Sequence, residues 1–274
     1  MKACMRDVLG KAKQGNFAIP ATNFIDWNSA KAYVEMSEEL NLPLILAFAQ
    51  VHSPYLSLEE AASIGKYFQE KAKIPVVLHL DHGQDLAFIK RAIQLGFNSV
   101  MIDASLDSFE ENVRKTKEVV EVAHEFGVDV EAEIGFVGAN GDVSKDEIKS
   151  IYTNVEDAEK FVQETNVDSL AVSIGTSHGL YKGIPKINFQ RLSELRNVLT
   201  IPLVLHGGSG SGDDNLNRCA REGISKINIY SDFMDAGAKS VSEKSFTNYI
   251  DVLKASREGM KTTLKHYYRV FETK

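Results

Sequence analysis

Short apolar runs alternate with amphipathic stretches along the whole chain. Stretches such as 86–95 and 108–126 carry apolar residues at the spacing of a helix that packs on one side. Gly96, Gly127 and Gly223 directly follow helical stretches, where a left-handed residue commonly ends a helix. The eight apolar runs, which we interpret as buried strands, are 17–23, 43–49, 75–80, 99–103, 128–134, 169–174, 201–206 and 224–229.

The order of these elements predicts the fold class. Near-continuous apolar strands separated by helices indicate a parallel sheet covered by helices. Eight is the number of strands that closes a (β/α)8 barrel, so the count disfavours a doubly wound open sheet. The stretch 251–271 predicts one more helix after the last barrel helix. Because no linker rich in Pro, Gly or Ser divides the chain, we predict an α/β protein with a single TIM-barrel domain over residues 1–274 and an additional C-terminal helix.

Composition and charge exclude several classes of partner. Apolar residues make up 43% and charged residues 25%, as in an ordinary globular protein. A net charge of −7 without a Lys/Arg cluster argues against nucleic acid and anionic membranes as partners. No signal peptide and no membrane span are recognisable, so a cytoplasmic location is expected. Cys4 and Cys219 have no CxxC spacing and are expected to be reduced thiols.

Histidines concentrate at predicted strand ends. Barrel enzymes build their sites from residues at the C-terminal ends of strands. Of the seven histidines, His52 lies near this rim, whereas two fall in helices and are expected at the surface, namely His124 and His266. The four at strand ends are His79, His82, His178 and His206. Three neutral imidazoles from different strands with an open fourth position describe a catalytic zinc site.

The segment "LHLDHG" contains two of these histidines and a carboxylate. Side chains alternate along a strand, so His79 and Asp81 share a face while His82 points away unless the chain turns. The strand breaks at the following glycine, which lets His82 reach the rim. We therefore predict a metal site formed by His82, His178 and His206, with Asp81 beside the metal and His79 as a buried supporting group.

Glycine-rich segments after strands 6, 7 and 8 predict a phosphate site. The loops after strands 7 and 8 of TIM barrels commonly bind phosphate with backbone N–H groups and a helix N-terminus. Here these loops read "HGGSGSGDDN" and "NIYSD", in which Ser231 is expected to cap the next helix. In "SHGLYKG", Gly179 allows close backbone approach, and Lys182 is either a phosphate-binding charge or a solvent-exposed one.

Six motifs together resemble a known family. "LHLDHG", "SVMIDAS", "VEAEIG", "SHGLYKG", "PLVLHGGSG" and "KINIYSD" resemble, in this order and over nearly the whole chain, the class II metal-dependent fructose-/tagatose-bisphosphate aldolases. The resemblance implies a zinc-dependent aldehyde-lyase that cleaves a ketose (bis)phosphate, such as fructose- or tagatose-1,6-bisphosphate, to dihydroxyacetone phosphate and an aldehyde. It makes His82, His178 and His206 the zinc ligands and Asp81 the proton-transfer group at the C4 hydroxyl.

The resemblance also implies further ligands and partners. A second, accessory metal would involve Asp103 and Glu133, and a monovalent cation would lie near Gly179. A homodimer or homotetramer is expected. The residues that it implies in holding dihydroxyacetone phosphate are Gly179, Gly207, Gly208, Ser209, Asn228 and Ser231. Asn23, which strand 1 shares with the family, and Lys182 are further candidates for binding the sugar phosphate.

The chain departs from the family in the loop after "EAEIG". Members carry an acidic pair there, whose glutamate moves the proton at C3 of dihydroxyacetone phosphate. Here Asn140 and Gly141 occupy these positions. Either Asp142, or Asp146 or Glu147 further along, substitutes, or the reaction differs. The alternatives are a related metal-dependent aldolase or epimerase for a different sugar-acid phosphate, and a barrel that binds a sugar phosphate without turnover.

Other departures lie on the side of the aldehyde. Ala47 and Ala49 stand where strand 2 of the family carries polar groups, and Tyr230 replaces a small or acidic residue. The second substrate is therefore expected to differ from glyceraldehyde 3-phosphate. A lysine-based mechanism needs an amine inside the barrel. Strand 6 contains no lysine, and Lys226 is expected away from the rim, near the start of strand 8.

Overall fold

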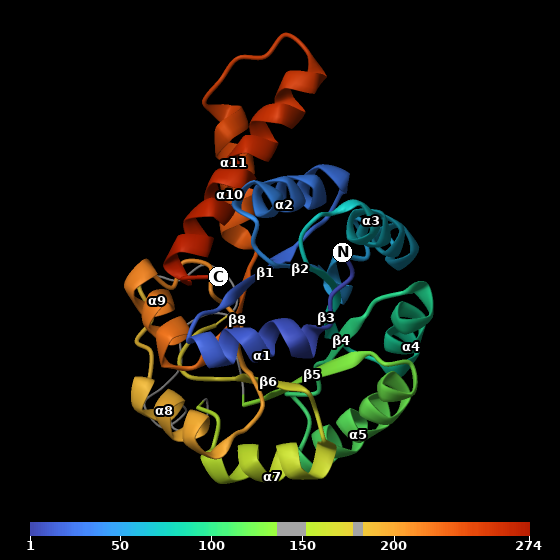
Figure 1. Ribbon diagram of the computed structural model, residues 1–274, viewed down its shortest axis with the longest axis vertical. Coiled ribbons are helices and arrows are strands. Elements are labelled where there is room, and N and C mark those ends of the chain that lie inside the picture. Colours follow the sequence, from blue (N-terminus) through green and yellow to red (C-terminus); the bar gives the residue numbers. More distant parts are fainter. Residues whose placement is uncertain (136–151, 178–182) are drawn as a thin grey trace.

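The computed structural model describes residues 1–135, 152–177 and 183–274. Its strands form a closed barrel in chain order, each parallel to its neighbours, and helices surround them (Figure 1). The strands are β1 (Ile19–Asn23), β2 (Leu44–Ala49), β3 (Val76–Gly83), β4 (Ser99–Ile102), β5 (Asp129–Ile134), β6 (Ser169–Val172), β7 (Leu203–Leu205) and β8 (Ile224–Ile229). The predicted (β/α)8 barrel is confirmed.

The helices follow the strands as the pattern predicts. They are α1 (Met5–Gly15), α2 (Trp27–Leu40), α3 (Leu58–Lys71), α4 (Leu86–Leu95), α5 (Phe109–Glu125), α7 (Val155–Thr165), α8 (Phe189–Val198), α9 (Asp213–Glu222), α10 (Ser231–Ser242) and α11 (Tyr249–Val270), with a short 3-10 helix, η1 (Gln50–His52). The three glycines expected at helix ends, Gly96, Gly127 and Gly223, all have positive φ.

Helix α1 is an element that the strand–helix count did not include. Its apolar residues Met5, Val8, Leu9 and Ala12 recur at helical spacing and are buried. They form one hydrophobic cluster with barrel-strand residues such as Val77. In Figure 1, α1 crosses the barrel in front of the strands, so it covers the N-terminal end of the barrel and leaves the opposite end for a site.

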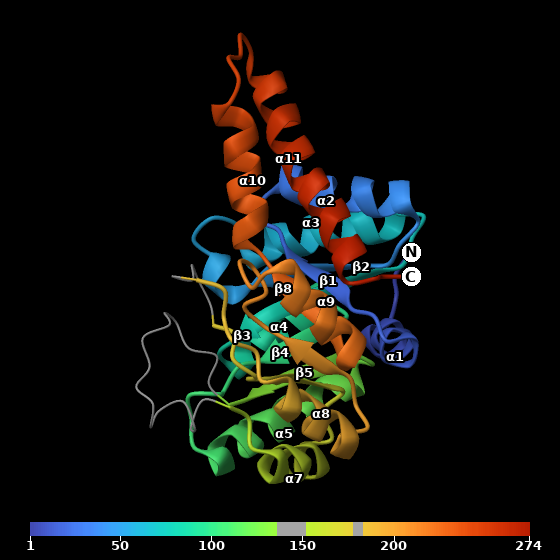
Figure 2. The same ribbon diagram turned by 90° about the vertical axis from the view of Figure 1, so that its left-hand side faces the viewer.

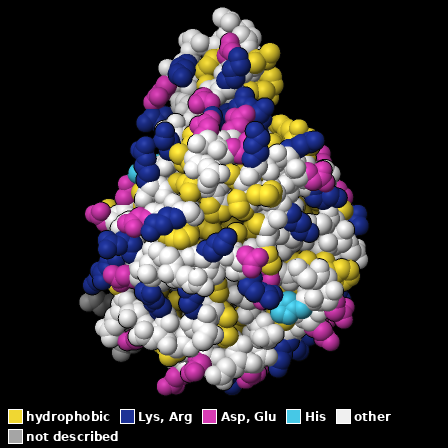
Figure 3. All heavy atoms as spheres, viewed as in Figure 1, with side chains coloured by type: hydrophobic (Ala, Val, Ile, Leu, Met, Phe, Trp, Pro, Cys, Tyr) yellow, Lys and Arg dark blue, Asp and Glu magenta, His cyan; other side chains and the backbone are white. Residues whose placement is uncertain are grey.

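Helices α10 and α11 form an antiparallel hairpin that projects from the barrel (Figures 1 and 2). Helix α11 confirms the predicted C-terminal helix, although it begins two residues before the expected position. Hydrophobic side chains gather near the free end of the hairpin in Figure 3, where Tyr249 and Ile250 are 71% and 64% exposed. Such a projection suits contact with a second copy of this chain. The expected homodimer or homotetramer stays a prediction.

Acidic and basic side chains intermix on the face shown in Figure 3. No block of one sign is visible on this face. Cys4 and Cys219 are free thiols, as expected. Among the described helices, none is long and apolar enough to cross a membrane.

Inside the barrel, a polar layer lies between the hydrophobic cluster packed on α1 and the C-terminal ends of the strands. Along β3, Leu78 and Leu80 pack outward with the helices, whereas Val77 joins the α1 cluster. His79 is therefore directed inward by strand alternation, and it is fully buried. Glu131 and Lys226 are also fully buried. This polar layer separates the α1 cluster from the strand ends.

Candidate active site

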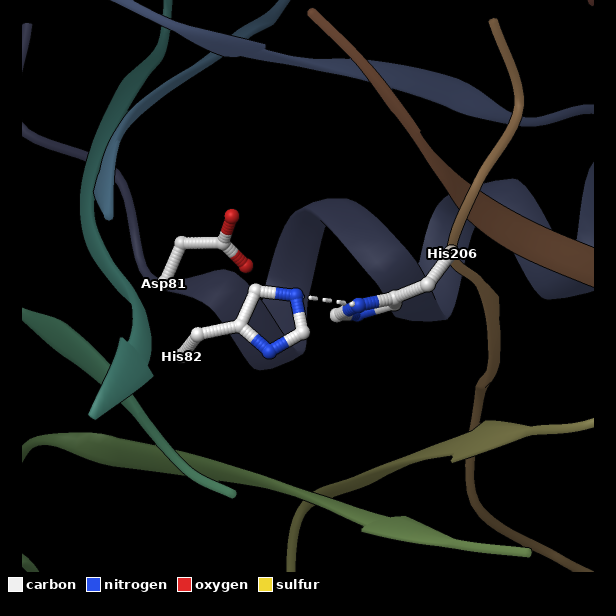
Figure 4. A group of neighbouring side chains, drawn as sticks. All are labelled: Asp81, His82 and His206. Carbon is white, nitrogen blue, oxygen red and sulfur yellow. Dashed lines mark hydrogen bonds between the residues drawn. The ribbon is translucent and has the colours of Figure 1, made fainter. Parts of the chain in front are cut away.

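A local irregularity in β3 turns Asp81 and His82 to the same side. The pairing of β3 with β4 shifts register between Leu80 and Gly83, and His82 has a φ of 46° in the left-handed region. This bulge cancels the alternation that would direct His82 outward. In Figure 4, Asp81 and His82 both point toward His206, which follows β7. The predicted turn of the chain therefore lies at His82 itself.

His82 and His206 face each other through one nitrogen each. His82 Nε2 and His206 Nδ1 are 2.9 Å apart, and the rings are nearly perpendicular. The outer nitrogens contact carboxylates, since His82 Nδ1 lies 2.7 Å from Asp103 Oδ2 and His206 Nε2 lies 2.9 Å from Glu131 Oε1. Carboxylates behind histidines are the usual way to orient metal-binding imidazoles with the lone pair inward.

The electrostatics of the two histidines differ. Burial would lower the pKa of His82, but Asp81 and the hydrogen bond with Asp103 outweigh it and raise the pKa to about 9. Burial lowers the pKa of His206. The proton that lies between the two inner nitrogens is thus bound to His82 Nε2 and is donated to His206 Nδ1. A cation that binds there takes the place of this proton.

Asp81 is a buried carboxylate with two amide partners. Its Oδ2 accepts a hydrogen bond of 2.9 Å from Asn23 Nδ2, and its Oδ1 accepts one of 3.0 Å from Asn228 Nδ2. Burial would raise the pKa of Asp81, but the neighbouring His82 and other positive groups lower it well below its ordinary value. Asp81 is therefore ionised, and its oxygens keep lone pairs for a substrate hydroxyl.

Two overlapping groups of side chains in the described residues can hold metal ions. The first is Asp81, His82 and His206, and the second is His82, Asp103 and Glu133. Glu133 Oε2 is buried without a hydrogen-bond partner among the described residues, and it lies 3.6 Å from His206 Nδ1. Burial and the nearby Asp103 raise the pKa of Glu133 to about 8. A cation beside Glu133 would satisfy this oxygen and keep the carboxylate ionised.

The sequence argument missed a buried ion pair beneath the histidines. Lys226 Nζ lies 2.9 and 2.8 Å from the two Glu131 oxygens and 3.3 Å from His79 Nε2. His79 Nδ1 contacts Ser99 Oγ at 2.8 Å, so His79 is a buried supporting group, as the parity argument suggested. The amine of Lys226 is inside the barrel but beneath the histidines, near the start of β8 and away from the rim, as expected. It is held by Glu131 rather than presented to the cavity.

The loop after β7 packs tightly against the loop after β6. Gly207 has a φ of 66°, and a Cβ there would lie 2.3 Å from the Ser177 carbonyl oxygen. The expected cap of the next helix is wrong: α10 has Tyr230 at its N-cap, and Ser231 is its first residue. Ser209 supplies the missing acceptor, because its Oγ accepts from the backbone N–H groups of Tyr230 and Asp232 at 3.1 and 3.4 Å.

One cavity of about 280 Å³ joins these parts. It is lined by Asp81, His82 and five of the predicted sugar-phosphate residues, which are Asn23, Gly207, Ser209, Asn228 and Ser231. Gly208 lies next to this lining and donates its N–H to the Asn228 carbonyl at 3.1 Å. The predicted residues His178, Gly179 and Lys182, and the candidate acids Asp142, Asp146 and Glu147, lie outside the described residues.

The cavity also has a wall that includes Ala49 and Tyr230, two of the positions at which the sequence departs from the family on the side of the aldehyde. Ala49, Val51 and His52 line it from the end of β2 and from η1, and Tyr230 lines it from the end of β8. The His52 and Tyr230 rings stack with centroids 4.5 Å apart. Burial lowers the pKa of His52, so its imidazole is neutral.

A family model described as class II fructose-bisphosphate aldolase matches residues 3–274. The chain belongs to the class II fructose-bisphosphate aldolase family. The protein is therefore an aldolase, a lyase that cleaves a carbon–carbon bond. Class II aldolases are generally metal-dependent, and two groups of side chains around His82 have the geometry to hold a metal ion.

Solved structures agree with this assignment. The YdjI aldolase from Escherichia coli K12 is 32% identical, with a TM-score of 0.91, and the match covers 100% of this aldolase and 98% of that chain. A protein described as a candidate fructose-1,6-bisphosphate aldolase from Coccidioides immitis is 27% identical, with a TM-score of 0.86 and coverage of 98% and 96%. Fructose-bisphosphate aldolase from Campylobacter jejuni, 24% identical with a TM-score of 0.83 and coverage of 99% and 95%, shares the fold.

Proposed function

We propose that the protein is a zinc-dependent aldolase that cleaves a ketose phosphate into dihydroxyacetone phosphate and an aldehyde. The observation that carries this proposal is the His82–His206 pair, whose inner nitrogens lie 2.9 Å apart beside Asp81. An imidazole that donates its outer N–H to a carboxylate presents a lone pair inward. Together with His178, the predicted third ligand, this donor set suits zinc.

Zinc bound to these histidines would polarise the ketose carbonyl and stabilise negative charge on the substrate. Asp81 takes the proton of the C4 hydroxyl. The O–H electrons then form the C4 carbonyl, the C3–C4 bond breaks, and its electron pair stays with the dihydroxyacetone phosphate half, which finally takes up a proton at C3. Asn23 and Asn228 hold Asp81 in place through their hydrogen bonds.

The substrate phosphate is expected at the loops after β7 and β8. Gly207, Ser209 and Ser231 line the cavity there, and α10 begins at Ser231. The first N–H groups of a helix and its dipole favour an anion. Since Ser209 accepts from N–H groups at the start of α10, it links the two phosphate loops into one unit.

We further propose a second, accessory cation at Asp103 and Glu133. The support is the Glu133 oxygen that is buried without a hydrogen-bond partner among the described residues. The monovalent cation implied by the resemblance would lie near Gly179, outside the described residues.

Metal removal tests the proposed function. Treatment with a chelator should abolish cleavage of a ketose phosphate, and added Zn²⁺ should restore it. Substitution of His82 by Ala should lower zinc content, whereas substitution of the exposed His266 should not. Cleavage that resists the chelator, with enzyme trapped by borohydride on substrate, would instead indicate a lysine-based reaction and refute the proposal.

A further inference from the structure

The wall formed by Ala49, Val51, His52 and Tyr230 has few polar groups. Ala49 is buried, and Val51 is 66% exposed at the cavity mouth. The polar groups that this wall offers are the His52 imidazole and the Tyr230 hydroxyl. Among the described residues that line the cavity, none is Lys or Arg.

The His52 side chain packs on the Tyr230 ring. This side chain is largely buried, with 8% exposure, and its ring lies at an interplanar angle of 35° to the Tyr230 ring. Its Nδ1 is buried and has no hydrogen-bond partner among the described residues. A buried polar nitrogen without a partner lowers stability, and a ligand group that pairs with the imidazole relieves this cost.

The chemistry of this wall distinguishes between two kinds of ligand. A neutral imidazole and a phenol can each donate and accept one hydrogen bond, as a sugar hydroxyl requires. A phosphate dianion would lose its hydration against Ala49, Val51 and two neutral rings, with no cationic side chain on this wall to compensate. The wall therefore suits a hydroxylated carbon chain without a phosphate group.

We propose that His52 and Tyr230 bind the hydroxyl groups of the aldehyde half of the substrate, so that the enzyme cleaves a ketose 1-phosphate in preference to a ketose 1,6-bisphosphate. This inference rests on the proposed aldolase function. One phosphate binds at the Gly207 and Ser231 loops, and the far end of the sugar is an uncharged polyol.

Substrate preference gives the first test. The wild-type enzyme with Zn²⁺ should condense dihydroxyacetone phosphate with D-glyceraldehyde at a kcat/KM about tenfold or more above that for D-glyceraldehyde 3-phosphate. In the cleavage direction, fructose 1-phosphate should likewise be preferred to fructose 1,6-bisphosphate. Equal use of the two aldehydes, or a preference for the phosphorylated one, overturns the inference.

The variant His52→Phe gives the second test, because it keeps the stacked ring and removes the nitrogens. The kcat/KM for D-glyceraldehyde should fall about tenfold, mainly through KM, while that for propanal, which lacks hydroxyl groups, should change less than about twofold. His52→Asn should recover part of the loss. The matched control is His266→Phe, which changes an exposed histidine on α11. Equal losses with both aldehydes would overturn the role of His52.

Deuterium exchange at C3 of dihydroxyacetone phosphate separates this inference from the proposed function. The exchange needs no aldehyde, so its rate does not depend on the proposed aldehyde site, and the control His266→Phe should leave it unchanged. If the wild-type enzyme with Zn²⁺ shows exchange but no preference among aldehydes, only the inference about the wall fails. If it shows neither exchange nor cleavage, the proposed function fails and the inference fails with it.

Discussion

Removal of Lys226 tests whether the buried ion pair supports His206. Lys226 Nζ lies 2.8 Å from Glu131 Oε2, and both side chains are fully buried. Two unit charges at this distance attract by about 6 kcal/mol at an effective dielectric constant of about 20. Part of this lost attraction is offset, because folding need not dehydrate a charge at position 226 when methionine replaces lysine. We therefore expect Lys226→Met to lower the free energy of unfolding by about 3–5 kcal/mol.

The same substitution should weaken metal binding. Burial would raise the pKa of Glu131, but Lys226 outweighs it and lowers the pKa to about 2. Without Lys226, the Glu131 carboxylate takes up a proton more readily and becomes a poorer acceptor for the outer nitrogen of His206. Loss of such a carboxylate partner typically reduces metal affinity about 10- to 100-fold.

Urea denaturation and zinc titration measure the two effects. The control is Lys254→Met, which removes an exposed lysine paired with the half-exposed Asp251 and should leave the free energy of unfolding nearly unchanged. In the double variant Lys226→Met/Glu131→Gln, the unpaired buried charge is gone, so stability should partly recover. A loss below about 1 kcal/mol for Lys226→Met, or a double variant less stable than the single one, would refute the reasoning.

Three further predictions concern the site itself. Asp81→Asn should lower kcat about 10²- to 10⁴-fold with zinc content unchanged, as measured by steady-state kinetics and metal analysis; a kcat within about twofold of wild type would remove Asp81 as the base. Because the pKa of His82 is raised to about 9, zinc must displace a proton from His82 at lower pH, so the zinc affinity should rise about tenfold per pH unit between about pH 6.5 and 8.5. Competition with a chromophoric chelator measures this affinity, and a flat pH profile would contradict the prediction. Gly207→Ala places a Cβ 2.3 Å from the Ser177 carbonyl oxygen, so KM for the sugar phosphate should rise at least about tenfold and the melting temperature should fall. An unchanged KM would show that this loop does not hold the phosphate.

The fold was predictable because its signals are local. Each strand is a short apolar run, and the helices between them carry apolar residues at helical spacing. The same signal was present in α1, where Met5, Val8, Leu9 and Ala12 recur at that spacing, but the helix precedes the first strand and falls outside the strand–helix repeat. The end of β3 was less predictable, since the sequence pattern does not show that pairing continues through Gly83.

The candidate site was predictable only in part. The His82–His206 pair and the Asn23–Asp81 contact follow from the position of these residues at strand ends. Glu131 and Lys226 are 95 residues apart, so no local pattern connects them. One signal was available: a charged residue stands in the middle of an apolar strand, in "VDVEAEI" and again in "ISKINI". Buried charges of opposite sign inside one barrel are expected to pair.

The bulge in β3 also limits how this site can diversify. Because Asp81 and His82 are consecutive residues on one bent backbone, any shift of that backbone moves the base and the metal ligand together. A change of substrate that required one of them to move alone would disrupt the other. The residues after β2, such as Val51 and His52, share no backbone with this pair. Sequence variation among related enzymes should therefore accumulate on the wall that contains Val51 and His52, while the Asp81–His82 pair in β3 stays invariant.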